Sequence, residues 1–148
     1  MPIRRHQRGF YPIDWPQLSA AIRFERAGGR CETCGRPHGK QVVHLGDGRW
    51  YDLEFGVWRD GDAQPLAHEP TLPEISATGR VTRVVLATAH RDHDTSNNDP
   101  ANLAAWCQRC HLIHDRFEHL RRRKITYLRR RALGDLFRGT YPGLYGRM

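Results

Sequence analysis

The sequence lacks a run of about 18 apolar residues, the length that a membrane-spanning helix requires, and neither end carries a lipidation motif. The first ten residues are basic, but no apolar stretch with a small-residue cleavage site follows them. The sequence therefore shows no secretory signal. We expect a protein that stays in the cytoplasm and does not associate with membranes.

Cysteine is scarce, because the 148 residues contain only four. They form two C-x-x-C pairs, Cys31 with Cys34 and Cys107 with Cys110. In a chain without an export signal, this arrangement favours metal binding over disulfides. Four thiolates suit one tetrahedral zinc ion, which would join the two pairs across the long stretch between them. Buried free thiols or a redox pair are the alternatives.

Acidic residues are also few, since 16 Asp and Glu stand against 24 Lys and Arg and the formal net charge is +8. Such an excess is typical of a domain that binds nucleic acid. We predict phosphate contacts by two clusters near the C-terminus, which are Arg121, Arg122, Arg123, Lys124 and Arg129, Arg130, Arg131. A solvated helix face is the alternative. Contacts of this kind give affinity without sequence specificity.

The length fits one domain with appendages. Asp14 as a cap and Pro16 in the first turn predict a helix over residues 15–27, which ends at the following glycines. Residues 36–79 are rich in glycine and proline turn points and contain short apolar stretches. We expect a hairpin with flanking loops there.

Residues 81–89 are apolar and β-branched and predict a buried strand, and residues 102–106 predict a short second strand. A helix is expected to begin within the second cysteine pair and to continue to about Lys124, followed by a second, basic helix. In the first of these two helices, the helical spacing of three apolar residues predicts the buried face, which is Ile113, Phe117 and Leu120.

His90, Asn102 and His111 follow one another in an order that has a known counterpart. The stretch from Thr88 to His114, together with Gly29–Gly35, resembles the HNH endonuclease family in its form with two C-x-x-C zinc pairs. The resemblance implies an α+β fold with a small ββα-metal unit. In that unit two short strands and a helix clamp one catalytic divalent cation, separate from the structural zinc.

The same resemblance implies a role for each residue of the motif. His90 would be the general base, Asn102 would fix the loop that carries it, and His111 would bind the catalytic cation, Mg²⁺, Mn²⁺ or another divalent ion. A histidine with an ordinary pKa near ~6.5 can accept a proton from water at neutral pH, while a cation takes up charge on the phosphate. The implied activity is metal-dependent hydrolysis of DNA phosphodiester bonds, leaving 3'-hydroxyl and 5'-phosphate ends. A compact site cuts one strand per engagement, so we expect nicking.

One position departs from the family pattern. The family often has a metal ligand directly before its catalytic histidine, and this sequence has Ala89 there. Asp92 or His93 on the same loop is favoured to complete the cation site, and His114, one helical turn after His111, is the other candidate. The alternative reading is a non-catalytic zinc-dependent nucleic-acid-binding module of a phage, restriction or repair assembly. RNA as the substrate is a third reading.

These observations predict the organisation of the chain. We expect a basic arm and helix over residues 1–28, and a zinc-stapled nuclease domain over residues 29–124 with a loop or hairpin insertion at 36–80. A basic helical tail would follow over residues 125–148. For His90 and His111, the alternative is that they support the zinc ligands. For Asn102, the alternative is an ordinary turn residue or helix cap.

Overall fold

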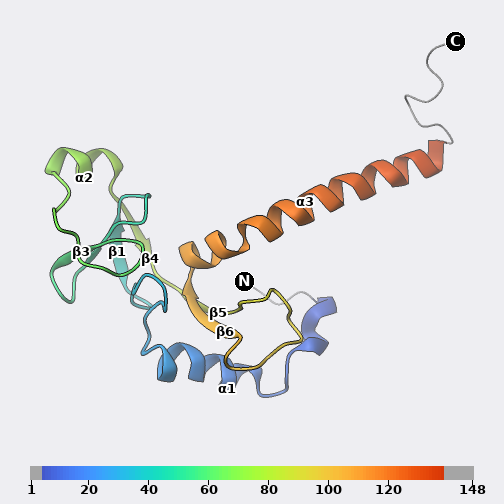
Figure 1. Ribbon diagram of the computed structural model, residues 1–148, viewed down its shortest axis with the longest axis horizontal. Helices are drawn as coiled ribbons and strands as arrows, with labels where there is room; N and C mark the ends of the chain where they lie inside the picture. The colour runs from blue at the N-terminus through green and yellow to red at the C-terminus, as the bar shows by residue number, and fades with distance from the viewer. Residues whose placement is uncertain (1–4, 139–148) are drawn as a thin grey trace, which may run out of the picture. The chain divides into compact units, whose positions relative to one another are not determined.

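The computed structural model describes residues 5–138 and divides into two compact units, Met1–Ile113 and His114–Met148. The outermost parts of the predicted arm and tail, residues 1–4 and 139–148, lie outside the described residues. The first unit holds two antiparallel sheets and short helices, which confirms the α+β class (Figure 1). The predicted domain boundaries stay predictions.

The N-terminal part begins with a short 3-10 helix, η1 (Arg5–Phe10), which is followed by α1 (Trp15–Ala20) and η2 (Ala21–Arg26). The last two form one continuous helical segment, which confirms the helix predicted over residues 15–27. Proline stands in its first turn as expected, but the Asp14 side chain makes no capping hydrogen bond. This segment packs Ile22 against the apolar residues Leu103 and Ala105.

The segment predicted as a hairpin with loops contributes most of a four-stranded sheet. Its order is β3-β2-β1-β4, and all pairs are antiparallel. The strands are β1 (Gln41–His44), β2 (Trp50–Asp52), β3 (Val57–Arg59) and β4 (Arg80–Arg83), with α2 (Leu72–Thr78) between the last two. Thr71 caps α2 by accepting a hydrogen bond from the backbone N–H of Glu74.

The single strand predicted over residues 81–89 is two strands, so that prediction is wrong in its extent. The first part is β4, and the second is β5 (Leu86–His90), which pairs with β6 (Leu103–Cys107) in a separate two-stranded sheet. The chain changes sheets at Val84, which is buried and bonds through its backbone to Gly39 and Lys40. The predicted second strand over residues 102–106 agrees with β6 to one residue.

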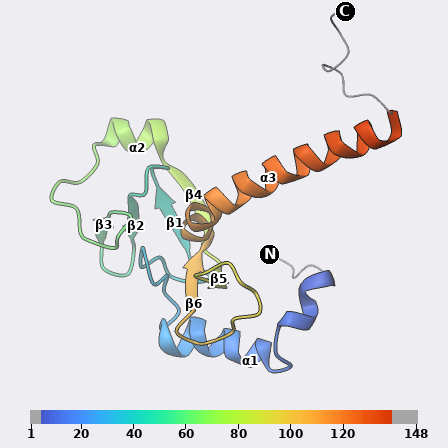
Figure 2. The ribbon, with the colours of Figure 1, turned by 45° about the vertical axis from the view of Figure 1, so that its right-hand side comes forward.

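The core of the first unit surrounds the cysteines. One cluster of buried side chains joins both sheets and contains the cysteines with apolar residues, which are Val42, Trp50, Val84, Leu86, Ala89, Ala104 and Trp106. All residues of β6 are buried. The α1–η2 segment lies beside the β5–β6 hairpin in both ribbon views (Figure 2).

The C-terminal helix α3 runs without interruption from Gln108 to Arg138, so the expected break near Lys124 does not occur. Its predicted buried face is also wrong, because the exposed fractions of Ile113, Phe117 and Leu120 are 52%, 71% and 52%. Among residues 5–138, no helix combines the length and the apolarity that crossing a membrane would need.

Candidate functional site

The structure brings the four cysteines together as predicted. Their sulfur atoms all lie within 4.8 Å of one another, and every one of these residues is buried. The Sγ atoms of Cys34 and Cys107 are 3.5 Å apart. Four zinc–sulfur bonds of about 2.3 Å place the sulfurs of a tetrahedral site roughly 3.8 Å apart. The cluster is therefore of a size that can hold a metal ion such as zinc.

Local backbone geometry positions each pair. In the first pair, the backbone N–H of Gly35 donates to the Cys31 carbonyl (2.8 Å), and Gly35 has a φ of 73° that glycine adopts without strain. In the second pair, Cys107 ends β6 and Cys110 lies in the first turn of α3. The Cys107 backbone N–H donates to the Cys31 sulfur at 3.3 Å, which joins the two pairs directly.

Hydrogen bonds within the cluster separate the pKa values of the four thiols. The hydrogen bond with Cys107 lowers the pKa of Cys31, and the hydrogen bond with Cys110 lowers the pKa of Cys107 to about 6. Hydrogen bonding with Cys107 raises the pKa of Cys34 and of Cys110. Thiolates are thus favoured at two positions by neighbouring S–H donors. A bound cation would replace those shared protons.

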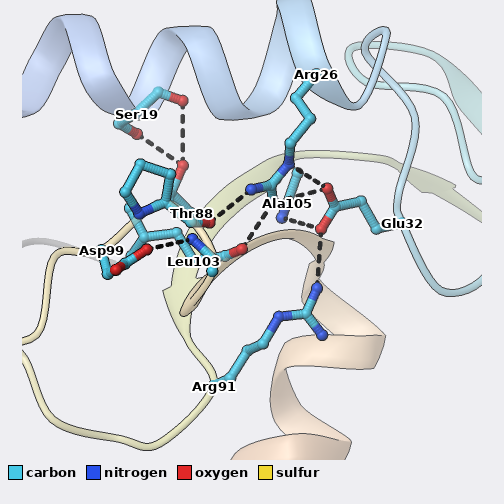
Figure 3. A network of polar contacts seen from close by, with 10 residues as sticks. Ser19, Arg26, Glu32, Thr88, Arg91, Asp99, Leu103 and Ala105 are labelled. Atoms are coloured by element: carbon cyan, nitrogen blue, oxygen red, sulfur yellow. Dashed lines mark hydrogen bonds and ion pairs between the residues drawn. The ribbon is translucent and has the colours of Figure 1, made fainter.

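Glu32, between the cysteines of the first pair, connects the cluster to the β5–β6 hairpin (Figure 3). Its Oε2 accepts a hydrogen bond from the Ala105 N–H at 3.1 Å, and its own N–H donates to the Ala105 carbonyl at 2.9 Å. Arg26 donates to Glu32 Oε1 at 2.8 Å, and Arg91 lies 3.5 Å from Oε2. The Glu32 carboxylate therefore links the turn between Cys31 and Cys34 to Arg26 of η2, to Ala105 of β6 and to Arg91, which follows His90.

Arg26 extends the same network to the loop between β5 and β6. Its two terminal nitrogens donate to the carbonyls of Pro100 and Leu103, both at 2.7 Å. Ser19 on α1 and Thr88 on β5 are joined by their hydroxyls at 2.9 Å (Figure 3). Sequence reasoning did not single out Arg26 or Glu32, because an isolated arginine is usually solvated and the C-x-x-C pattern leaves its two middle positions open.

His90 ends β5 and is 8% exposed. Its Nε2 lies 3.0 Å from the side-chain oxygen of Asn98. The Asn98 amide nitrogen donates to the carbonyl of Phe10 at 2.8 Å, and Ser96 and Thr95 add longer contacts at 3.3 and 3.4 Å. Because the Asn98 amide nitrogen contacts three carbonyls, it lies on their side of the amide group, and the amide oxygen faces His90. The Nε2 atom must then carry the hydrogen, which leaves Nδ1 as the acceptor of the neutral ring.

Aromatic residues from the N-terminal segment enclose the same ring. Trp15 stacks on His90 with centroids 5.6 Å apart and an interplanar angle of 8°. Tyr11 meets His90 edge-on at 5.7 Å and Trp15 at 4.6 Å, and burial raises the pKa of its hydroxyl. These contacts restrict the orientation of the imidazole. Sequence reasoning missed them because about 80 positions separate the partners, with no local pattern to connect them.

Asn102 braces the loop that follows His90. Its amide nitrogen donates to Asp92 Oδ1 and to the Asn97 carbonyl, both at 2.9 Å, and its oxygen accepts the Asp92 N–H at 3.2 Å. The backbone adds a bond from the Arg91 N–H to the Asn102 carbonyl at 2.8 Å. Asn102 thus links the beginning of the loop to its end.

The two loop residues considered as cation ligands differ in their surroundings. The Asp92 carboxylate accepts hydrogen bonds from the side chains of Asn102 and Asn97 and from the Asp94 N–H. These bonds, with that from Asn102 the strongest, lower the pKa of Asp92 to about 2. His93 has a positive φ of 62°, a conformation that histidine adopts more readily than most residues. Its N–H lies 3.4 Å from the His90 carbonyl.

The remaining predicted residues lie on or beside α3. His111 follows Cys110 in the first turn, and its ring centroid is 6.5 Å from that of Trp106. In the second unit, Glu118 pairs with Arg121 at 3.3 Å and with Arg122 at 2.7 Å. Ala89, which directly precedes His90, is 3% exposed and pairs with Ala104 across the hairpin.

Comparison with protein-family models, curated proteins and solved structures found no match to this chain.

Proposed function

We propose that the chain is an endonuclease of the HNH type that hydrolyses DNA phosphodiester bonds, with a single-strand nick as its elementary event. The observation that carries the proposal is the environment of His90. This buried imidazole is held by Asn98 and Trp15 so that Nδ1 is its proton acceptor. A general base needs such a fixed orientation and tautomer. The proposal is also supported by the order of the elements, because β5, β6 and α3 follow one another as two short strands and a helix, and the cysteine cluster lies at the junction of β6 and α3.

Two metal sites belong to this proposal. The four clustered cysteines would hold a structural zinc ion. His111 and His93 would hold the catalytic cation, Mg²⁺ or Mn²⁺. His93 is favoured over Asp92, because three donors of the loop already occupy the Asp92 carboxylate. When bound, the cation supplies a Lewis acid for the charge that develops on the phosphate and the leaving oxygen.

The chemistry assigned to the residues themselves is proton transfer and positioning. His90 Nδ1 takes a proton from a water molecule, whose oxygen forms a bond to phosphorus. The bond from phosphorus to O3' breaks, and O3' takes a proton from solvent, which gives a 3'-hydroxyl and a 5'-phosphate. Asn102 keeps the loop in place during this step. General-base assistance of this kind contributes about 10²- to 10⁴-fold to a rate.

DNA is the proposed partner, and the arginine-rich part of α3 is its proposed contact. Glu118 pairs with Arg121 and Arg122, whereas the second cluster, Arg129–Arg131, has no carboxylate partner among residues 8–132, whose side chains the structure describes. Arginines that contact a phosphate backbone displace the counterions condensed on it. Binding should therefore weaken steeply as salt increases.

A second candidate function rests on Ala89. Its buried methyl group offers no ligand at the position where the family has one. If neither loop residue completes a cation site, the chain is a zinc-dependent nucleic-acid-binding module without activity. Zinc content and DNA binding do not distinguish the two functions, but cleavage does.

A supercoiled-plasmid assay tests the proposal, with Mg²⁺ or Mn²⁺ added or withheld and zinc retained. We expect the wild-type protein to produce nicked circles only with the added cation, and His90→Ala to lose about 10²- to 10⁴-fold of the rate. His68→Ala, at an exposed position, is the matched control and should cut normally. A labelled RNA of equal length tests the third reading. A wild-type protein that binds the plasmid and leaves it intact with both cations would establish the non-catalytic module.

A further inference from the structure

A second group of cationic side chains lies outside the proposed nuclease site, at one end of the four-stranded sheet. His44, the last residue of β1, is the direct cross-strand partner of Arg80, the first residue of β4. Partners directly opposite in an antiparallel pair lie on the same face. Thr82, two residues along β4, therefore shares this face, and its hydroxyl lies 2.9 Å from His44 Nε2.

Arg109 approaches this end of the sheet from the first turn of α3. Its guanidinium reaches the turn that follows β1, where it lies 3.4 Å from the Asp47 carbonyl. A Cβ atom built on Gly48 would lie 2.7 Å from the Arg109 guanidinium, and one on Gly61 would lie 3.4 Å from it. Two glycines therefore leave the space that this side chain occupies. Arg36, which is 5% exposed, donates to the Gly48 carbonyl at 3.2 Å.

No carboxylate balances these charges. Within the described residues, the side chain of Arg80 has no hydrogen bond or ion pair, and the polar partners of the Arg36 and Arg109 side chains are backbone carbonyls. The acidic residues nearest in sequence to His44 and Arg80 are Asp47 and Glu74, and both of these are bound to Arg49.

The charges are close enough to act on the histidine between them. Burial lowers the pKa of His44, and repulsion by Arg36, Arg80 and Arg109 lowers it further. Cations that crowd together without a counter-charge repel one another, and an anion placed among them relieves that repulsion. Guanidinium groups match the oxygen spacing of a phosphate and bind it through paired hydrogen bonds.

We propose that Arg80 and Arg109 form a phosphate-binding site beside His44, whose two ring nitrogens are already bonded to Thr82 and Gly46, and that this site receives a backbone phosphate of the bound DNA, away from the phosphodiester that is cut. The choice of DNA as the source of the phosphate rests on the proposed function. The site places an anchoring contact on the segment 36–80, which lies outside the nuclease motif. Arg109 lies between Cys107 and Cys110, so the proposed phosphate-binding site is directly connected to the cysteine cluster.

The first measurement is a titration of the zinc-loaded protein with inorganic phosphate, in which nuclear magnetic resonance records the signals of the His44 ring. We expect added phosphate to shift the ring signals of His44 and to raise its pKa, because the anion offsets the three arginines. In Arg80→Ala the pKa of His44 should start higher and respond less. Arg80 is exposed and unpaired, so its removal should leave the fold intact. Signals of His44 that do not respond to phosphate in the wild type would overturn the proposal.

The second measurement is the salt dependence of binding to a short DNA duplex without divalent cation. Loss of one phosphate contact lowers the slope of log K against log salt by about 0.9. We expect this change in Arg80→Ala and a smaller one in the matched control Arg83→Ala. Arg83 lies on the same strand and carries the same charge, but its side chain is on the opposite face.

The outcomes separate this proposal from the proposed function. Equal effects of the two substitutions on DNA binding, with cleavage retained, would overturn the phosphate site alone. A wild-type protein that cuts no DNA but shows the His44 response and the Arg80-specific loss of binding would overturn only the nuclease function. If His44 responds to free phosphate but both variants bind DNA like the wild type, the ligand is a small phosphate and DNA is excluded.

Discussion

At the scale of single residues, Asn98 determines which nitrogen of His90 carries the ring hydrogen. We expect Asn98→Leu to lose the preference for the Nε2–H form and to reduce cleavage by up to about 10²-fold, because the acceptor nitrogen is no longer fixed. Asn98→Asp retains an acceptor for the Nε2 hydrogen and should keep the tautomer. Nitrogen-15 spectra of the ring measure the tautomer independently of activity. An unchanged Nε2–H form in Asn98→Leu would contradict this role.

Asn98 also shows which part of the candidate site could not be predicted from the sequence. The motif spacing indicated His90 and Asn102 as candidate site residues, because each has a defined place relative to the cysteines. Asn98 stands in a polar run where several asparagines and aspartates are equally plausible loop residues. Its contact with the Phe10 carbonyl, and the stacking of Trp15, depend on how the N-terminal segment folds back. No local pattern encodes such a contact.

At the scale of elements, hydrogen bonds of Asn102 join the beginning and the end of the loop that follows His90. Asn102→Ala should raise the pKa of Asp92 from about 2 toward its ordinary value near 3.9. Because the folded pKa is depressed, the stabilisation from these bonds is present above the ordinary value and is lost as pH falls toward 2. Carboxyl carbon-13 titration measures the shift. A pKa that stays near 2 in the variant would show that Asn97 and the Asp94 amide suffice.

The elements also show what residue patterns cannot specify. The apolar, β-branched run 81–89 predicted extended chain correctly, but its hydrophobicity does not reveal that the chain leaves one sheet for another at Val84. The helical spacing of Ile113, Phe117 and Leu120 predicted the helix and wrongly predicted their burial. Periodicity reports that side chains share a face, whereas burial requires another element to cover that face.

At the scale of the whole molecule, the cysteine cluster joins two parts of the chain that lie far apart in sequence. The cluster contains Cys31 and Cys34 from the turn after η2 and Cys107 and Cys110 from the junction of β6 and α3. Apolar residues of both sheets pack around them. The spacing of the two pairs was enough to predict this closure, because four thiolates in two C-x-x-C pairs have a specific use. It could not predict the sheet that forms between the pairs.

Removal of the metal tests whether the cluster stabilises the first unit. Structural zinc contributes roughly 10–16 kcal/mol in small zinc-binding peptides, which is as large as the whole stability of a typical domain, about 5–15 kcal/mol. Chelation should therefore unfold the first unit and expose Trp50 and Trp106, which are 0% and 7% exposed. Tryptophan fluorescence would shift to longer wavelength, and one equivalent of zinc would restore it. Cleavage should not return with Mg²⁺ alone, since Glu32 connects the turn between Cys31 and Cys34 to Ala105 of β6 and to Arg91, which follows His90. A metal-free protein with unchanged fluorescence and melting temperature would instead identify the cysteines as buried free thiols.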